Sequence, residues 1–251
     1  LGHYSRIAEQ HFLLAWRLAP QHPQPAAKMI WIATHGLSSR WNERDWFYES
    51  VRGQLDWMPA YSSMSNALLP RWGGSHRDML RLASECLATN RYDTCVPTFL
   101  TSILWSIQKE TGQLREVARR PDALVLIRQC VDGLKQAVDQ GNSCPDATDQ
   151  VWAQLGFYLI CAQEYEEARQ CLTRMEDQDW LERPYGWIDM KVDHALGLVY
   201  AATGPAADNV IVFEELLNNP TAESATPEAM QEVIDLVVES RQLDTRFESQ
   251  A

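Results

Sequence analysis

Apolar residues recur at steps of three and four along most of this chain, which is the spacing of one face of an α-helix. The stripe after Pro121 is the most regular and consists of Leu124, Ile127, Val131, Leu134 and Val138. Comparable stripes lie at residues 12–19, 29–37, 99–107 and 230–238. No segment alternates apolar and polar residues as a half-buried strand does. The pattern therefore predicts an all-α fold of about eleven or twelve helices joined by short loops.

Helix-start signals support this prediction. Residues 42–45, 75–78 and 143–146 each place Asn or Ser three positions before Asp. Such a side chain accepts a hydrogen bond from a backbone N–H that the first helical turn leaves unpaired, and the carboxylate favours the positive end of the helix dipole. With short loops between them, the helices are expected to form antiparallel pairs stacked in series.

The strongest repeat signal lies at residues 151–175. Trp152, Leu155, Gly156, Tyr165 and Ala168 have the spacing of a tetratricopeptide repeat, and here the sequence resembles that family. Gly156 and Ala168 are expected where two helices of a pair cross. Trp152 and Leu155 would fill the gap to neighbouring helices, and Tyr165 would begin the second helix. The resemblance implies an α-α superhelix, a right-handed tetratricopeptide-like solenoid of antiparallel helix pairs.

A second, degraded copy of the repeat follows. Gly197 and Tyr200 repeat the pattern of the first helix, 41 residues after Gly156 rather than the usual period of about 34. Residues 177–184 are interpreted as an insertion that accounts for the longer period. Asn209 stands where the second helix should carry a small residue, which departs from the repeat pattern.

The N-terminal half has a different pattern, with Trp46-Phe47, then Pro59-Ala-Tyr61, then Trp72-Gly-Gly-Ser75. This combination resembles an uncharacterised family of bacterial helical-repeat proteins, and the resemblance implies a fold and no activity. We expect a Trp-rich helical-repeat region at residues 1–115 and an acidic tetratricopeptide-like region at residues 116–251. The two would form one continuous solenoid.

Composition and charge narrow the function. With 45% hydrophobic residues in a chain of 251, intrinsic disorder is excluded as a description of the whole chain. No apolar stretch is long enough for insertion into a membrane. The net charge of −12 divides into +4 over residues 1–120 and −16 over residues 121–251, so nucleic acid is not an expected partner. The acidic surface could serve solubility, dock a basic partner, or support self-association with the basic half of a second copy.

Candidate chemistry is sparse. The six cysteines have no zinc spacing, which favours reduced thiols and a cytoplasmic location. Asp189, Asp193 and His194 share one predicted helix, which supplies too few ligands for a metal ion. No catalytic motif is recognisable, so no cofactor, no metal and no enzymatic activity are expected. Because the chain starts at Leu1 without Met, it is interpreted as a fragment or a processed chain.

Ten Trp residues suggest either core packing or an aromatic groove for a peptide, a partner helix or a sugar ring. Trp57 and Trp72 border predicted turns, so they are the ones expected to be exposed. The glycines after Trp72, flanked by Arg71 and His76, would suit a phosphate at a helix start, but a plain turn with left-handed glycines is the preferred interpretation.

The sequence thus predicts a non-enzymatic protein–protein interaction scaffold, or an accessory subunit of a larger assembly, that binds a partner segment in a helical-repeat groove. The expected partner-binding residues are Gln150, Gln154, Phe157, Lys191, His194, Leu198, Trp57, Arg71 and Trp72. The alternative is a binder of a small ligand, a sugar or a peptide, or a helical enzyme, using the Trp-rich segment.

Overall fold

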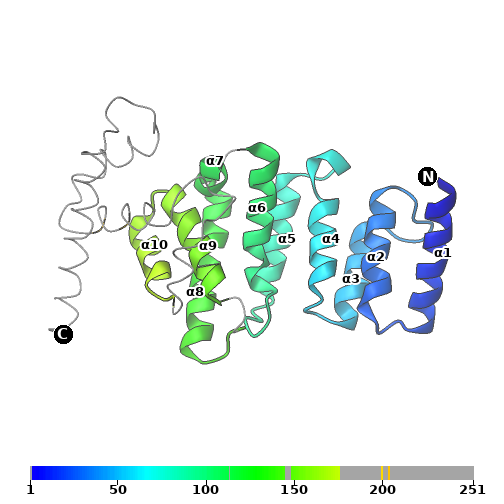
Figure 1. Ribbon diagram of the computed structural model, residues 1–251, viewed down its shortest axis with the longest axis horizontal. Coiled ribbons are helices and arrows are strands. Elements are labelled where there is room, and N and C mark those ends of the chain that lie inside the picture. Colours follow the sequence, from blue (N-terminus) through cyan, green and yellow to red (C-terminus); the bar gives the residue numbers. More distant parts are fainter. Residues whose placement is uncertain (1, 113, 145–147, 176–198, 200–202, 204–251) are drawn as a thin grey trace, which may run out of the picture. The chain divides into compact units, whose positions relative to one another are not determined.

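A computed structural model describes residues 2–112, 114–144 and 148–175, together with residues 199 and 203 (Figure 1). Every regular element among these residues is helical, which confirms the all-α prediction for the described part of the chain. The chain divides into two compact units, Leu1–Ala147 and Thr148–Ala251. The predicted boundary after residue 115 falls inside the short helix α7, Leu114–Arg119, which lies in the first unit.

The described residues of the first unit form eight α-helices and two short 3-10 helices. They are α1 Gly2–Leu18, α2 Pro23–Thr34, α3 Glu43–Gly53, α4 Met58–Ala67, η1 Pro70–Trp72, α5 His76–Ala88, η2 Pro97–Phe99, α6 Leu100–Thr111, α7 Leu114–Arg119 and α8 Pro121–Asp139. In the second unit, the described residues form α9 Thr148–Cys161 and α10 Tyr165–Leu172. The helices predicted beyond residue 175 lie outside the described residues.

Local sequence sets where these helices begin. Asn42 caps α3 by accepting a hydrogen bond from the Asp45 backbone N–H at 2.9 Å, and the Asp45 carboxylate accepts from the Asn42 N–H at 3.1 Å. Ser75 caps α5 by accepting from the Asp78 N–H at 3.1 Å. Pro121 stands at the first turn of α8, where the missing N–H costs nothing. The third predicted helix start, at residues 143–146, lies partly outside the described residues, which omit residues 145–147.

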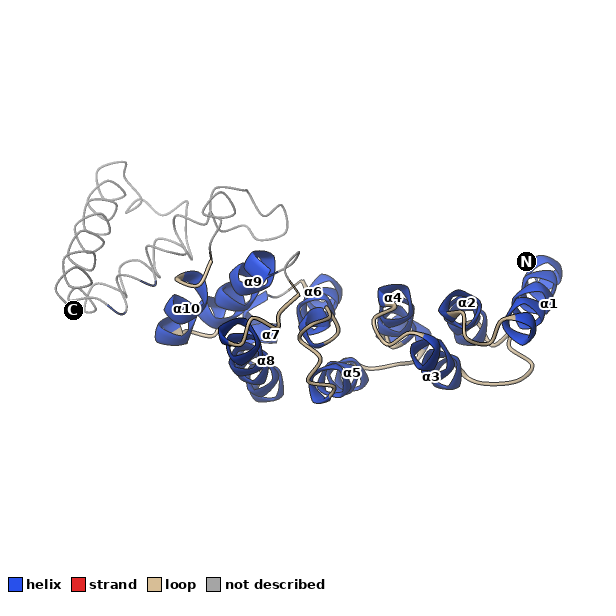
Figure 2. Ribbon diagram, turned by 90° about the horizontal axis from the view of Figure 1, so that it is seen from below, coloured by secondary structure: helices blue, strands red, loops and turns tan. Residues whose placement is uncertain are grey.

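The helices of the first unit form two layers. Figure 2 shows α2, α4 and α6 in one layer and α3, α5 and α8 in the other. Helix α2 packs against both α3 and α4, and α5 packs against both α6 and α8. The Ser50 hydroxyl of α3 donates a buried hydrogen bond to the Pro23 carbonyl of α2 at 2.9 Å. Helices α2 and α5 thus each pack against two helices that come later in the chain.

The core of the first unit lies between these layers. Met29 and Ile30 of α2, Leu82 of α5 and Ile103 of α6 are fully or almost fully buried. Fully burying such a side chain contributes about 1.5–3 kcal/mol each. Met29, Ile30 and Ile103 belong to the apolar stripes of the sequence, so at these helices the amphipathic pattern predicts which face is packed.

In the second unit, α9 and α10 approach each other closely at Gly156. A Cβ at this position would lie 3.0 Å from Leu172 Cδ2 and 3.6 Å from Cys171 Cβ. Ala168, Leu155 and Trp152 are buried as well. The second helix begins at Tyr165. The pair is therefore held together where small side chains allow the backbones to come near each other.

Among the described residues, no helix combines the length and the apolar character that a membrane-spanning segment requires.

Candidate interaction surface

Three aromatic side chains, from α2, its C-cap residue and η1, form a row of tilted rings in contact that is open to solvent. The ring centroids of Trp31 and His35 are 4.3 Å apart, and those of His35 and Trp72 are 4.8 Å apart. The imidazole therefore contacts two indoles. Trp31 is 55% exposed and Trp72 is 46% exposed, so about half of each large ring faces water. We call Trp31, His35, Arg71 and Trp72 the aromatic patch.

Helix α2 places the first two members of the aromatic patch. Trp31 and His35 are four positions apart, so they share one face at the C-terminal end of the helix. His35 Nδ1 lies 2.8 Å from the Trp31 carbonyl oxygen, which fixes the ring against the last turn. Gly36 then ends the helix in the left-handed conformation, and the Leu37 N–H donates to the Ile32 carbonyl at 3.1 Å.

The turn after α4 places Trp72. Gly73 has a φ of +91°, which glycine adopts without strain. At Gly74, a Cβ would lie 2.2 Å from the Leu68 carbonyl oxygen, so any side chain would collide with the backbone. Ser75 uses its hydroxyl group to cap α5. The two glycines therefore form a tight turn next to Trp72. Of the two glycines predicted to be left-handed, only Gly73 is, and Gly74 is instead required by its close approach to the Leu68 backbone.

Charged side chains border the aromatic patch. Arg71 Nη1 pairs with Glu110 Oε1 of α6 at 2.8 Å, and its side chain remains 59% exposed. Lys28 is exposed on α2 and lies three positions before Trp31, on the same side of the helix. The aromatic patch thus contains one cationic side chain, Arg71, and is bordered by a second, Lys28.

Three other Trp residues of the first unit serve packing. Trp16, Trp41 and Trp46 contact one another with centroid distances of 4.7–5.5 Å. Arg40 lies over the Trp41 ring at 4.3 Å, and Trp46 Nε1 donates to the Ser38 hydroxyl at 3.2 Å. Trp46 is fully buried, so this cluster joins α1 and α3 and offers little surface to a partner.

Trp57 was expected to be exposed, and the structure finds it half-buried at the start of α4. Its ring lies 6.5 Å from that of His22, centroid to centroid. Its Nε1 is buried without a hydrogen-bond partner among the described residues. Trp57 thus lies apart from the three rings of the aromatic patch, and its packing partner is the residue that caps α2.

The predicted partner-binding residues of the second unit have different environments. Gln150 is exposed and Gln154 is half-buried, whereas Phe157 is 1% exposed. A partner can therefore reach the two amide side chains more readily than the phenyl ring. The other predicted partner-binding residues of this unit, Lys191, His194 and Leu198, lie outside the described residues, and so do the predicted repeat-packing residues Gly197 and Tyr200.

Sequence reasoning missed Trp31 and His35. Trp31 lies next to the apolar stripe of α2 in the sequence, and a large aromatic residue outside such a stripe is the signal that could have found it. His35 follows one helical turn later. Their contact with Trp72, 37 residues away from His35, depends on how α2 packs against α4 and has no local signal.

Known proteins and metal-binding geometry give no further assignment. No protein-family model, no curated protein and no solved structure matches this chain. Within the described ranges, no group of three or more His, Cys, Asp or Glu could hold a metal ion.

Proposed function

We propose that this chain is a non-enzymatic protein–protein interaction module, a scaffold or an accessory subunit of a larger assembly, and that it holds a partner segment on the aromatic patch. The observation that carries the proposal is the contact of two half-exposed indoles with one imidazole. Trp and Arg are enriched among the residues that dominate binding energy at protein interfaces. The patch contains two Trp residues and Arg71.

The exposed area supports a substantial binding contribution. A Trp side chain buries up to about 250 Å². Because roughly half of each indole is exposed, a partner covering one ring would remove about 120 Å² from water. At about 25 cal/mol per Å², that is roughly 3 kcal/mol for each ring before the costs of association.

The aromatic patch is also preorganised. His35 is fixed by its contact with the Trp31 carbonyl, and Trp72 is fixed by a turn in which Gly74 touches the Leu68 backbone. Side chains that are already ordered lose little conformational entropy when a partner binds. This favours a binding role over a role as incidental exposed surface.

The charges indicate the chemistry of the partner. Lys28 and Arg71 border the rings, and residues 1–120 carry a net charge of +4. We propose a partner segment that places an apolar or aromatic side chain on the indoles and carboxylates beside the two cations. The amide side chains of Gln150 and Gln154 would belong to a second contact on the other unit.

We also propose that the helices form a tetratricopeptide-like solenoid. The contacts of α2 with both α3 and α4, and of α5 with both α6 and α8, support this proposal. In such stacks a series of helix pairs presents one continuous surface to an extended partner. The exposed rings of the aromatic patch lie on helix α2 and on the turn that follows α4.

Cross-linking with mass spectrometry in the native lysate tests the proposal. The chain has four Lys residues, so an amine-reactive reagent reports on few places, and Lys28 lies one turn from Trp31. We expect a stoichiometric partner joined to Lys28, and the loss of that cross-link in Trp31→Ala and Trp72→Ala. Tyr48→Ala is the matched control, since Tyr48 is 48% exposed on α3 in the other layer.

Each outcome decides between the candidates. Loss of the cross-link in both patch variants, with retention in the control variant, supports the proposal. A partner that binds all the variants equally contradicts it. Saturable quenching of Trp fluorescence by a sugar, abolished in Trp72→Ala, would favour the small-ligand alternative instead. An oligomer that dissociates with added salt while its helix content is unchanged would favour self-association through the charged halves.

A further inference from the structure

Two cysteines of the first unit lie in direct contact although they are far apart in sequence. Cys95 Sγ and Cys144 Sγ are 3.2 Å apart and 49 residues apart in the chain. Both residues are half-buried. A disulfide bond has an S–S distance of about 2.05 Å, so its formation requires the sulfurs to approach by only ~1.2 Å.

Backbone contacts hold the two cysteines in register. The Cys144 N–H donates to the Tyr92 carbonyl at 2.8 Å. The Tyr92 ring packs on Gly133 of α8, where an added Cβ would lie 2.2 Å from the phenol oxygen. The Tyr92 hydroxyl donates to the Gln129 carbonyl at 3.4 Å. The loop that carries Cys95 is therefore fixed to the helix that precedes Cys144.

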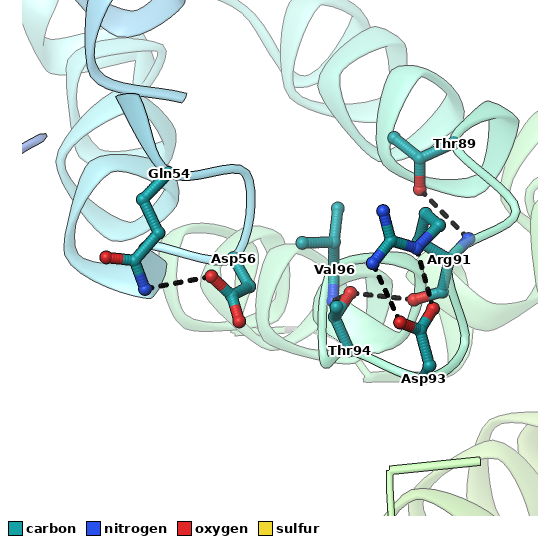
Figure 3. Close-up of polar contacts among 7 residues, drawn as sticks. All are labelled: Gln54, Asp56, Thr89, Arg91, Asp93, Thr94 and Val96. Carbon is teal, nitrogen blue, oxygen red and sulfur yellow. Dashed lines mark hydrogen bonds and ion pairs between the residues drawn. The ribbon is translucent and has the colours of Figure 1, made fainter. Parts of the chain in front are cut away.

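The loop that carries Cys95 is itself ordered by polar contacts (Figure 3). Arg91 forms two hydrogen bonds of 2.8 Å with the Asp93 carboxylate, which lower the pKa of that carboxyl group. The Thr94 hydroxyl donates to the Arg91 carbonyl at 2.7 Å and accepts from the Val96 N–H at 3.3 Å. The position of Cys95 is thus built into the turn.

On the other side, the end of α8 is ordered in the same way. Gly141 has a φ of +66°, and the Asn142 N–H donates to the Ala137 carbonyl at 2.8 Å. This is the hydrogen-bond pattern of a helix that ends at a left-handed glycine. Cys144 follows three residues after Gly141 and therefore reaches the Cys95 loop from a fixed starting point.

We propose that Cys95 and Cys144 are a modification site at which a reversible disulfide cross-links the loop between α5 and η2 to the segment after α8. The oxidant is a low-molecular-weight disulfide. One protein thiolate attacks a sulfur of that disulfide, forms a mixed disulfide and releases one small thiolate. The second protein thiolate then attacks the protein sulfur of the mixed disulfide and releases the other. Two protein thiols lose two protons and two electrons, and one small disulfide is reduced to two thiols.

The other cysteines are poorly suited to this chemistry. Cys86, Cys130, Cys161 and Cys171 are all buried. Burial raises the pKa of the Cys86 thiol to about 12, and it raises that of Cys171 to about 12. Thiolates are the reactive species, so these groups react slowly near neutral pH. Cys95 and Cys144 are therefore the pair expected to respond to an oxidant in the folded protein.

Disulfide mapping of the folded full-length chain, treated with oxidised glutathione, tests the proposal. We expect four alkylatable thiols instead of six, a mass loss of about 2 Da, and complete reversal by dithiothreitol. Digestion with trypsin and an Asp-specific protease identifies the bond, because Asp146 and Asp149 separate Cys144 from Cys161. Cys95→Ser should abolish the cross-link and Cys86→Ser should retain it.

A second readout measures the effect on stability. Closing a loop of about 50 residues is expected to increase the folding equilibrium constant roughly 1,000-fold in the chain-entropy model. The urea midpoint should therefore rise on oxidation of the wild type and stay unchanged in Cys95→Ser. Six alkylatable thiols after treatment, a stable mixed disulfide with glutathione, or a bond to another cysteine would each overturn the proposal. The inference does not depend on the proposed function.

Discussion

Gly133 offers a prediction in which the sign of a substitution depends on one neighbouring residue. In the middle of an exposed helix, Gly→Ala stabilises by about 0.5–1 kcal/mol, because alanine loses less backbone entropy on folding. Gly133 lies inside α8, but the Tyr92 ring occupies the space that a methyl group would need. The added Cβ would lie 2.2 Å from Tyr92 Oη and 2.4 Å from Cζ.

The Tyr92 ring cannot move away without loss. Tyr92 is 6% exposed, and its carbonyl accepts the Cys144 N–H. Forcing an extra methyl group into such a contact costs about 1–3 kcal/mol. The balance predicts that Gly133→Ala lowers the free energy of unfolding by roughly 1–2 kcal/mol. In a Tyr92→Ala background the same change should raise it by about 0.5–1 kcal/mol.

Urea denaturation followed by Trp fluorescence measures this cycle. Seven of the ten Trp residues lie at residues 1–147, so the signal reports mainly on the first unit. Circular dichroism provides a second probe of the same transition. The four proteins of the cycle should differ in midpoint with similar slopes. A higher midpoint for Gly133→Ala in the wild-type background would refute the packing argument.

Three further predictions concern other local contacts. Asn42→Ala should lower the free energy of unfolding by about 1 kcal/mol, because it removes the side chain that caps α3, whereas Asn42→Asp keeps a capping oxygen and should leave the free energy unchanged. Equal urea midpoints for the wild type and the Ala variant would disprove this role. Glu9→Ala should lower the free energy of unfolding by about 1–3 kcal/mol, because the Glu9 carboxylate accepts from the Ser39 N–H at 2.6 Å and from the Ser39 hydroxyl at 2.7 Å. Glu9→Gln retains an acceptor and should lower it less, and a urea midpoint lower for Gln than for Ala would contradict this role. When the folded protein is alkylated at pH 8 and analysed by mass spectrometry, Cys95 should react well before Cys86. Burial raises the pKa of the Cys86 thiol to about 12, so roughly one Cys86 in ten thousand is a thiolate at this pH. Equal alkylation rates would argue against the burial of Cys86.

The helices could be predicted from the sequence because their signals are local. Asn42 with Asp45 and Ser75 with Asp78 act within one helical turn, and Pro121 fixes a first turn by its own ring. Helix α2 ends at Thr34, although its apolar stripe continues to Leu37. Leu37 belongs to the apolar stripe but follows the left-handed Gly36, and its N–H completes the turn.

The aromatic patch could be predicted only in part. Trp72 and Arg71 border a turn signalled by two glycines, and a turn between helices is usually exposed. Which of the other Trp rings is buried depends on neighbours from distant segments. Trp46 is fully buried and its ring contacts that of Trp16, 30 residues away in sequence. Trp31, by contrast, remains 55% exposed. No pattern within a single helix distinguishes these two outcomes.

Contacts between distant cysteines are beyond sequence reasoning for the same reason. Cys95 lies close to Cys144 because the Tyr92 ring packs on Gly133 and so fixes the loop that carries Cys95 against α8. Neither cysteine has a neighbour at a recognisable spacing. The proximity appears only after α5, α6 and α8 have packed together.

The central claim is that the aromatic patch binds a protein segment, and an affinity measurement tests it most directly. The segment identified by cross-linking would be synthesised and titrated by isothermal calorimetry against the wild type, Trp72→Ala and the control Tyr48→Ala. An energetically dominant residue contributes at least about 2 kcal/mol, so the dissociation constant should increase at least ~30-fold for Trp72→Ala. It should remain within about twofold for Tyr48→Ala. An unchanged dissociation constant for Trp72→Ala, with its helix content intact, would contradict the account.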